Sequence, residues 1–239
     1  LTYDQAMSDH EHLSEWKAAA TKEIRCRKEK GTWQEVPMSD AKTKILPGTW
    51  VFRRKRTPDG TIKKYKARYC VRGDLQEGEQ ETFAPVVAFS TVRTFLALTL
   101  AFGWPSISID FDQAFIQAPM SEPVWIHPPR GFYTQNHRGQ RTCLRLLRSL
   151  YGLRTAPLMF FEYCHAAFVE LGFTSCSQDR CLLLRHNCIV VLYVDDAGIA
   201  APSEAIINAL IRDLESLGMQ LTREGSFVEF LGIKFTPQP

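Results

Sequence analysis

Two adjacent carboxylates interrupt an apolar stretch late in the chain. Asp195 and Asp196 follow the run CIVVLYV at 188–194 and precede Ala-Gly-Ile-Ala. A carboxylate in an apolar strand is costly unless it is paired or binds a cation, and two neighbouring carboxylates repel each other. A divalent ion such as Mg²⁺, which takes oxygen ligands, removes both problems. The pair also suits an exposed hairpin turn, and taken alone the turn explains it better.

A second acid ends another apolar strand. Asp110 closes the run SISID at 106–110. If the two strands are neighbours in one sheet, Asp110 lies beside Asp195, and three carboxylates meet at the end of that sheet. Such a set suits two-metal phosphoryl transfer, in which one ion activates a hydroxyl group and the other binds phosphate oxygens and the leaving group. The candidate catalytic and metal-binding residues are therefore Asp110, Asp195 and Asp196.

The basic charge of the chain is concentrated in one block. The net charge is +3, but residues 53–72 hold nine Lys or Arg and one acid, a local balance of +8, so the other 219 residues sum to −5. A block of this kind fits a nucleic-acid or phosphate partner. On charge alone, a solvated hairpin or a localisation-like basic run explains it equally well.

Periodicity and turn residues predict the elements that must position these groups. Strands at 49–56 and 62–71 flank Pro58-Asp59-Gly60 and should form a hairpin that carries the basic block. Helices are expected at about 9–30, 91–102, 157–172 and 203–217. The first should begin with a capping box at Ser8–Glu11, and the second should be buried. Further strands are expected at 106–111, 124–127, 181–185 and 188–194, with a final pair at 220–223 and 227–236. The mixture predicts an α+β fold with an antiparallel sheet.

The composition is that of a soluble globular chain. The 239 residues are 45% hydrophobic and 23% charged, enough for one large domain or two small ones. No apolar run approaches the roughly 20 residues that cross a bilayer, and the polar, acidic N-terminal stretch does not read as a signal peptide. Seven cysteines without regular close spacing are expected to be reduced thiols of an intracellular protein. A zinc site at Cys176, Cys181, His186 and Cys188 is a weaker alternative, because the cluster lacks a C-x-x-C knuckle.

An ordered series of motifs resembles the reverse transcriptases of copia-type (Pseudoviridae-like) LTR retrotransposons. The series comprises GTW at 31–33, WVFRRK at 50–55, KYKAR at 64–68, ETFAPVV at 81–87, D-x-x-x-AF at 110–115, SLYGL at 149–153, YVDD at 193–196 and FLGI at 230–233. The resemblance implies a right-hand polymerase fold of α+β class, with fingers and palm subdomains and an antiparallel palm sheet, and without thumb or RNase H. Together these form one reverse transcriptase domain: residues 1–40 are a helical lead-in, 41–90 and 120–156 the fingers, 91–119 and 157–239 the palm.

The resemblance also implies roles for single residues. Asp110, Asp195 and Asp196 resemble the metal-binding triad, and the backbone carbonyl of Phe111 should also face a metal. The residues expected to bind the nucleotide are Lys66 and Arg68, which grip the triphosphate, Phe115, a steric gate against ribose, and Tyr151, which lines the pocket. Leu231 and Gly232 resemble the primer grip. Without the resemblance, Phe115 is better explained as core and Tyr151 as a turn aromatic.

The activity implied by the resemblance is RNA-directed DNA polymerase, a nucleotidyltransferase that adds deoxynucleotides to a primer 3′ end. The cofactors are two Mg²⁺ ions, with Mn²⁺ as a substitute. The partners are a primed RNA or DNA template and deoxynucleoside triphosphates and, in a longer polyprotein of which this chain is a fragment, integrase and RNase H. No membrane partner is expected. The location is cytoplasmic, including a virus-like particle, with a product destined for the nucleus.

A second hypothesis is a degenerate or domesticated element that binds nucleic acid without catalysis. It is motivated by the missing thumb and by Asp112, an acid where the family often has Lys or Asn. Asp112 either weakens triphosphate binding or is turned away from the site. A third hypothesis, another palm-type nucleotidyltransferase, is disfavoured by the LYGL and FLGI motifs.

Overall fold

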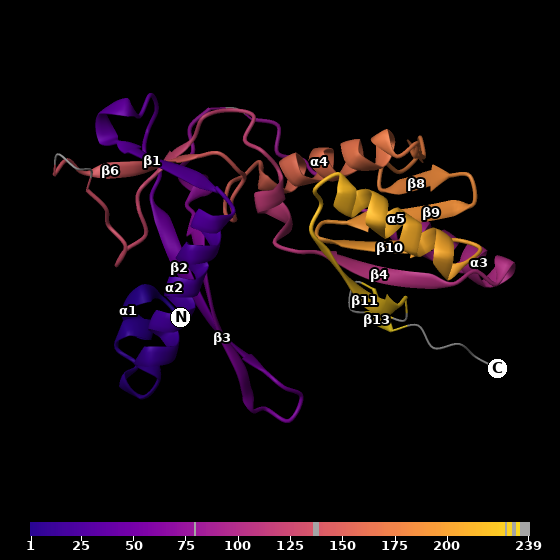
Figure 1. The fold of residues 1–239 in the computed structure, drawn as a ribbon, viewed down its shortest axis with the longest axis horizontal. Coiled ribbons are helices and arrows are strands. Elements are labelled where there is room, and N and C mark those ends of the chain that lie inside the picture. Colours follow the sequence, from indigo (N-terminus) through magenta and orange to yellow (C-terminus); the bar gives the residue numbers. More distant parts are fainter. Residues whose placement is uncertain (79, 136–138, 228, 231–232, 235–239) are drawn as a thin grey trace. The chain divides into compact units, whose positions relative to one another are not determined.

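The structure is a computed structural model that describes residues 1–78, 80–135, 139–227, 229–230 and 233–234 (Figure 1). The chain divides into two compact units. The first unit comprises Leu1–Thr82 and Ala118–Ala156, and the second comprises Phe83–Gln117 and Pro157–Pro239. Among the helices in the described ranges, none has the length and apolar character needed to cross a membrane. All seven cysteines are free, as the sequence predicts.

The first unit contains a long hairpin, a three-stranded sheet and the N-terminal helices. Its helical elements are α1 (Tyr3–Met7), η1 (His10–His12), α2 (Leu13–Glu29), η2 (Met38–Asp40) and η3 (Gly73–Leu75). Its strands are β1 (Trp33–Pro37), β2 (Gly48–Arg56), β3 (Ile62–Val71), β5 (Trp125–Ile126) and β6 (Thr142–Leu146). The predicted hairpin is confirmed as β2 and β3, paired antiparallel. The sequence did not predict the antiparallel sheet, of order β1-β6-β5.

Helix α2 packs one face of the hairpin through aromatic side chains. The ring of Trp16, which is fully buried, lies 5.5 Å from that of Phe52 on β2 and 4.6 Å from that of Tyr65 on β3. These contacts fix which face of β2–β3 is covered, because side chains alternate between the two faces of a strand. The other face of the hairpin remains uncovered by α2.

The predicted start of this helix is wrong. Helix α2 begins at Leu13 rather than near residue 9, and the capping box forms earlier, between Thr2 and Gln5 of α1. Asp9 does not cap α2. Its carboxylate instead accepts a hydrogen bond from the Trp16 indole at 2.9 Å and another from Arg54. Tertiary hydrogen bonds have therefore overridden the local signal.

The second unit is a six-stranded sheet with helices. Its helical elements are α3 (Phe89–Phe102), η4 (Ala114–Gln117), α4 (Ala156–Glu170) and α5 (Glu204–Ser216). Its strands are β4 (Ser106–Phe111), β7 (Thr174–Ser175), β8 (Leu182–Arg185), β9 (Cys188–Tyr193), β10 (Asp196–Ala200), β11 (Leu221–Ser226), β12 (Glu229–Phe230) and β13 (Ile233–Lys234). The sheet order is β11-β4-β10-β9-β8-β7, and each neighbouring pair is antiparallel. The expected mixture of helices with antiparallel sheet is confirmed.

Two predictions for this unit need correction. Among the described residues, the strands expected at 220–223 and 227–236 have other partners: β11 pairs with β4, and β12 pairs with β13. The helix expected at 91–102 forms, but it is only partly buried. Its inner side is Val92, Phe95 and Thr99, whereas Leu100 is 76% exposed.

The two faces of the six-stranded sheet have different coverings. Helix α4 covers the face of Ile109 and Phe111, since the rings of Phe111 and Phe160 lie 5.5 Å apart. On the opposite face, a Cβ added to Gly198 would lie 2.4 Å from the ring of Phe227, which explains why glycine is required there. Asp110 and Asp196 lie on this second face, because Asp110 is two residues beyond Ser108 and Asp196 two residues before Gly198.

Candidate active site

Strand register brings the candidate carboxylates together. Asp110 on β4 is the direct cross-strand partner of Asp196 on β10, and on its other side it faces Thr222 of β11. Direct partners in an antiparallel pair project from the same face, with Cβ atoms about 4.5–5.5 Å apart. The sequence had placed Asp110 beside Asp195. Asp195 instead reaches β4 through its backbone, whose carbonyl accepts a hydrogen bond from the Phe111 N–H at 2.7 Å.

The turn that carries Asp195 is tight and strained. Tyr193 pairs with Asp196, so Val194 and Asp195 alone connect β9 to β10. Val194 has φ of +52°, a left-handed conformation that is unusual for a β-branched residue. Strain of this kind is typical of functional sites, where surrounding structure holds it in place. The two interpretations of the acidic pair are thus compatible, since one hairpin turn presents both acids at the end of the sheet.

The electrostatics of the site are unfavourable to ionised carboxylates. Partial burial, together with the nearby charges of Asp195, Asp110 and Glu224, raises the pKa of Asp196 to about 6. A divalent cation would reverse this penalty, so the donor set fits a hard metal ion. Glu224, which the sequence did not single out, lies beside a β-bulge in β11 between Arg223 and Gly225. Such bulges often re-aim side chains near active sites.

The described side chains do not form a closed metal centre. Within the described ranges, no three His, Cys, Asp or Glu side chains gather closely enough to ligate one ion. Asp110, Asp195 and Asp196 are therefore brought near one another by register and turn geometry rather than by a finished coordination shell. The same finding applies to the cysteines of the zinc alternative, of which Cys181 and Cys188 are buried.

We predict that Asp196→Asn stabilises the metal-free chain at pH 7.5. Because the pKa of Asp196 is raised on folding, from 3.8 to about 6, ionisation costs the folded state stability as the pH rises through this window. Above pH 6 the penalty is complete, and allowing for solvent screening we expect the variant to gain about 1–2 kcal/mol. Urea titration in EDTA measures the free energy of unfolding of the variant and of the unchanged chain. The difference between them should vanish below pH 4, and a difference at pH 3.5 equal to that at pH 7.5 would contradict the assignment.

Asp112 is turned toward β11. Both of its carboxylate oxygens lie 3.2 Å from the Thr222 hydroxyl, which donates to them. Thr222 is also the cross-strand neighbour of Asp110, so this contact keeps Asp112 near the same end of the sheet and leaves both alternatives for this extra acid open.

Phe115 lies in the short 3-10 turn η4 that follows β4. Its ring is 6.5 Å from that of Phe160 on α4, and the side chain is half-buried. The turn begins after Gln113, whose φ is +53°, so the chain bends sharply between Asp110 and Phe115. This bend presents a large ring close in sequence to a candidate catalytic carboxylate, but the gate role itself stays a prediction.

In the first unit, the hairpin register collects cations on one face. The face opposite α2 carries five of them: Arg53, Lys55, Lys64, Lys66 and Arg68. Arg53 directly faces Lys66, and Lys55 faces Lys64. Like charges in direct register are destabilising. Within the described part of the chain none of the five forms an ion pair, whereas Arg54 on the covered face pairs with Asp9.

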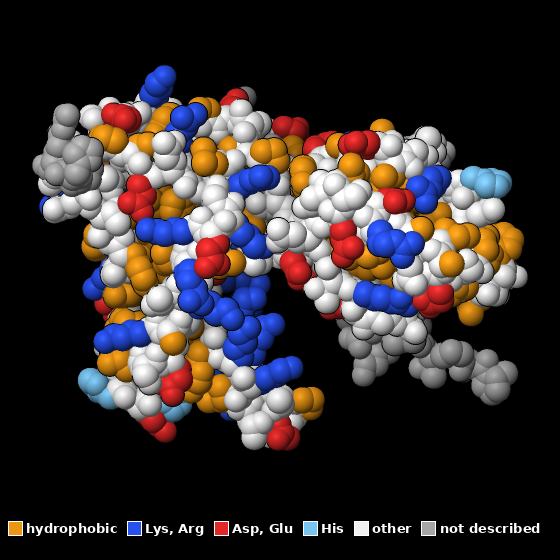
Figure 2. Space-filling model, viewed as in Figure 1, with side chains coloured by type: hydrophobic (Ala, Val, Ile, Leu, Met, Phe, Trp, Pro, Cys, Tyr) orange, Lys and Arg blue, Asp and Glu red, His pale blue; other side chains and the backbone are white. Residues whose placement is uncertain are grey.

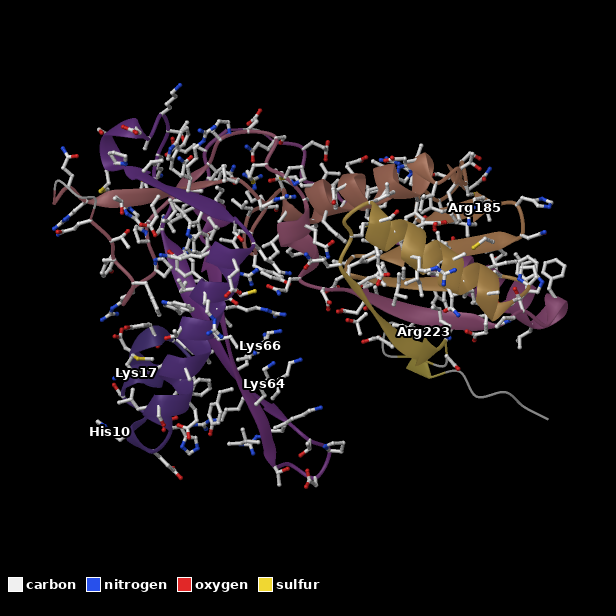
Figure 3. All side chains as sticks on the ribbon, viewed as in Figure 1. His10, Lys17, Lys64, Lys66, Arg185 and Arg223 are labelled. Atoms are coloured by element: carbon white, nitrogen blue, oxygen red, sulfur yellow. The ribbon has the colours of Figure 1, made fainter. Side chains whose placement is uncertain are left out.

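The uncovered cations form a patch. Figure 2 shows Lys and Arg side chains gathered over the hairpin. In Figure 3, Lys64 and Lys66 project from one side of the hairpin, whereas Lys17, on α2, lies on the other side. We call Arg53, Lys55, Lys64, Lys66 and Arg68 the cationic face. Partial burial, and then the charges of Arg68, Lys55 and Lys64, lower the pKa of Lys66. A polyanion bound here would relieve this repulsion.

Tyr151 lies beside this face, also in the first unit. The guanidinium carbon of Arg68 is 4.9 Å from the centre of its ring, and that of Arg27 is 6.0 Å away. Arg27 is 2% exposed and pairs with Glu23, whose Oε1 accepts from its Nη2 at 2.8 Å. The same oxygen accepts from the Tyr69 N–H at 3.3 Å, which ties α2 to β3. The stacked ring of Tyr151 therefore supports the Arg68 guanidinium, and Glu23 and Arg27 support the ring.

The sequence missed Glu23 and Arg27, although a signal was present. In the helical series Trp16, Ala20 and Ile24, position 27 continues the buried stripe, and an arginine there needs an acid one turn away.

Gly152 brings Tyr151 to this position. Its φ is +92°, and a Cβ there would lie 2.1 Å from the carbonyl oxygen of Val71. The Val71 N–H donates to the Tyr151 carbonyl at 2.7 Å, so the 149–153 segment pairs closely with the end of β3. We predict that Gly152→Ala lowers the free energy of unfolding by about 2–4 kcal/mol, because backbone must move and the left-handed conformation is lost. Urea unfolding checks this against Gly60→Ala, whose φ is +90° but whose Cβ would meet nothing within 4 Å. Equal losses in the two variants would contradict the packing argument.

The candidate primer-grip residues, Leu231 and Gly232, lie outside the described residues.

Comparison with known proteins identifies the family of the chain. A family model described as "Reverse transcriptase (RNA-dependent DNA polymerase)" matches residues 30–238. The chain is 28% identical over 237 residues to the retrovirus-related Pol polyprotein from transposon RE2 of Arabidopsis thaliana, covering 96% of this chain and 16% of that protein. It is 27% identical over 233 residues to the Pol polyprotein from transposon TNT 1-94 of Nicotiana tabacum, covering 94% of this chain and 17% of that one.

A third relative comes from yeast. The transposon Ty1-ER2 Gag-Pol polyprotein of Saccharomyces cerevisiae is 28% identical over 210 residues, covering 82% of this chain and 11% of that protein. The chain thus spans roughly one sixth or less of the length of these relatives. The family match covers most of the sequence and includes every candidate catalytic residue. The chain therefore belongs to the reverse transcriptase (RNA-dependent DNA polymerase) family, and its relatives are the copia-type Pol polyproteins of retrotransposons.

Proposed function

We propose that this chain is the catalytic part of an RNA-directed DNA polymerase and adds deoxynucleotides to a primer 3′ end. The observation that carries the proposal is the cross-strand pair Asp110–Asp196, with Asp195 in the adjoining turn. Three carboxylates at one sheet end match the ligand chemistry of phosphoryl transfer. In this proposal the palm is 91–119 and 157–239, which lies largely in the second unit, and the fingers are 41–90 and 120–156, which lie largely in the first unit together with the helical lead-in at 1–40.

Asp110, Asp195 and Asp196, with the Phe111 carbonyl, would hold two Mg²⁺ ions, for which Mn²⁺ can substitute. When bound, these ions lower the pKa of the primer hydroxyl and neutralise charge on the triphosphate. The chain's own contribution is to preorganise the acids. The hydrogen bond between Phe111 and Asp195 fixes the turn, and the pairing of β4 with β10 fixes the spacing of Asp110 and Asp196.

Roles in nucleotide binding are proposed for residues within each unit separately. Lys66 and Arg68 supply a point charge and a planar fork for the triphosphate, and Tyr151 holds the Arg68 fork by stacking. Phe115 would exclude a ribose 2′-hydroxyl. The remaining cations of the cationic face suit the phosphate backbone of the primed template. For the primer grip, Leu231 and Gly232 are proposed on the sequence motif alone.

The relatives are much longer than this chain, so its context is also proposed. In a full polyprotein it would be joined to integrase and RNase H, and it would act in the cytoplasm, including virus-like particles, on a product destined for the nucleus. These proposals rest on the family and on the names of the relatives as Pol polyproteins.

Primer extension tests the proposal. The chain, in excess over a DNA primer annealed to an RNA template, should add the templated deoxynucleotide when Mg²⁺ is present and add none in EDTA. Templated addition that persists in EDTA would contradict the metal assignment. A complete absence of addition, with salt-sensitive binding retained, would support the second candidate, an element that binds nucleic acid without catalysis. The observation that favours this candidate is the cationic face, which needs no catalytic carboxylates to bind a polyanion.

A further inference from the structure

Gln117 is a buried polar side chain that the proposed function does not use. It is 7% exposed and ends the turn η4. Its amide bridges two separate backbone segments. Nε2 donates to the carbonyl of Asp112 at 2.9 Å and to that of Gln220 at 2.7 Å, and Oε1 accepts from the Gln220 N–H at 2.9 Å. The nitrogen and the oxygen of the amide therefore both have backbone partners. These partners are Asp112, which precedes Phe115, and Gln220, which precedes β11.

These bonds close the loop that carries Phe115. The bond from Gln117 to Asp112 joins the two ends of the six-residue segment 112–117, and the Asp112 N–H donates to Gln220 at 2.9 Å. Phe115 sits between the two anchored ends. Its ring has α4 on one side, through Phe160 at 6.5 Å. Without the Gln117 amide, the downstream end of the loop would lose its side-chain tie to Asp112 and Gln220.

We infer that Gln117 is a positioning residue that sets the depth of the Phe115 ring and thereby the selection of deoxyribose over ribose. The inference rests on the proposed function, in which that ring meets the sugar. A shift of the ring by about 1 Å is enough to alter the rate of a positioned reaction by a large factor. Gln117 acts through Phe115 and does not itself touch the nucleotide.

The test is sugar discrimination, measured as the ratio of kcat/KM for dCTP to that for CTP on an RNA template, since these two nucleotides differ only at the 2′ position. Gln117→Met keeps the length of the side chain and removes the three hydrogen bonds described above. We expect its ratio to fall by roughly tenfold or more, with a higher KM for dCTP. Partial unfolding lowers both rates equally and leaves the ratio unchanged. Gln34→Met, at an exposed position on β1, is the matched control and should keep the ratio of the unchanged chain.

Two further variants separate the outcomes. Phe115→Ala should lower the ratio through direct loss of the ring. If it does so while Gln117→Met keeps the full ratio, the inference is overturned and the proposed function stands. If the unchanged chain adds no nucleotide, the proposed function fails and the inference fails with it. If Gln117→Met is insoluble, Gln117→Asn, which keeps an amide on a shorter side chain, should show a smaller fall, and an unchanged ratio there also overturns the inference.

Discussion

Asp110→Asn should lower the rate of single-nucleotide incorporation about 1000-fold or more, with little change in the affinity for primed template. Asp110 has Asp196 as its direct partner on one side and Thr222 on the other, so it lies at the centre of the acidic sheet end. An amide cannot replace an anionic ligand of a metal ion on which the chemistry depends. Rapid-quench kinetics with enzyme in excess measures the incorporation step separately from dissociation.

The matched control is Asp112→Asn, the same substitution two residues away. The Asp112 carboxylate accepts from the Thr222 hydroxyl, and an asparagine oxygen can accept that hydrogen bond too. We expect this variant to stay within about threefold of the unchanged chain, because it leaves the proposed ligands in place. Equal losses in Asp110→Asn and Asp112→Asn would show that charge near β4, rather than a specific ligand, matters.

Neutralising the cationic face should weaken nucleic-acid binding and flatten its salt dependence. The triple change Arg53→Gln, Lys55→Gln and Lys64→Gln removes three cations that register places on one face. Each lost phosphate contact lowers the slope of log affinity against log salt by about 0.7 to 0.9, so the slope should fall by about 2 to 3. Fluorescence anisotropy with a labelled primer–template, between 50 and 300 mM NaCl, measures both the affinity and the slope.

A triple change of equal charge provides the control. Lys17→Gln and Lys22→Gln on α2, with Lys63→Gln on β3, remove three exposed cations that lie outside the cationic face. This variant should keep most of the slope. If both triples reduce affinity and slope equally, binding depends on net charge and not on the face that the hairpin register creates.

The sequence predicted the elements of the site better than their pairing. Apolar runs ending in acids predicted β4, which carries Asp110, and β9, which leads into the acidic turn, because strand burial leaves a strong local pattern. No strand was predicted over β10, which begins at Asp196. The sequence also did not predict that Asp196, rather than Asp195, is the direct partner of Asp110, since register depends on the two-residue turn with Val194 at positive φ. No propensity scale favours a valine there.

Residues that act through long-range hydrogen bonds were the hardest to find. Gln117 and Gln220 are 103 positions apart, and Tyr69 and Glu23 are 46 apart, so no local window relates them. The short strand expected at 124–127 is confirmed as β5, but its sheet was missed for a similar reason, because β6 pairs with β1 from a distant part of the sequence. Short strands hold their place through their neighbours and not through their own pattern.

The basic block, in contrast, could be predicted from local sequence. Its charge follows from the composition of residues 53–72, and its hairpin follows from Pro58-Asp59-Gly60, a strong turn signal between two β-rich runs. What the sequence left open was whether the cations are shared between the two faces. The register answers this by placing Arg53, Lys55, Lys64, Lys66 and Arg68 together, opposite the α2-covered side.

The central claim is that the carboxylates at this sheet end hold the divalent ions of a polymerase, and ion binding tests it most directly. Mn²⁺, titrated into the chain with primed template and a non-hydrolysable deoxynucleoside triphosphate, can be followed by electron paramagnetic resonance as free ion is lost. We predict saturable binding by the unchanged chain and by Asp112→Asn, and a loss of at least tenfold in affinity for Asp195→Asn. Binding by Asp195→Asn that equals that of the unchanged chain would contradict the claim.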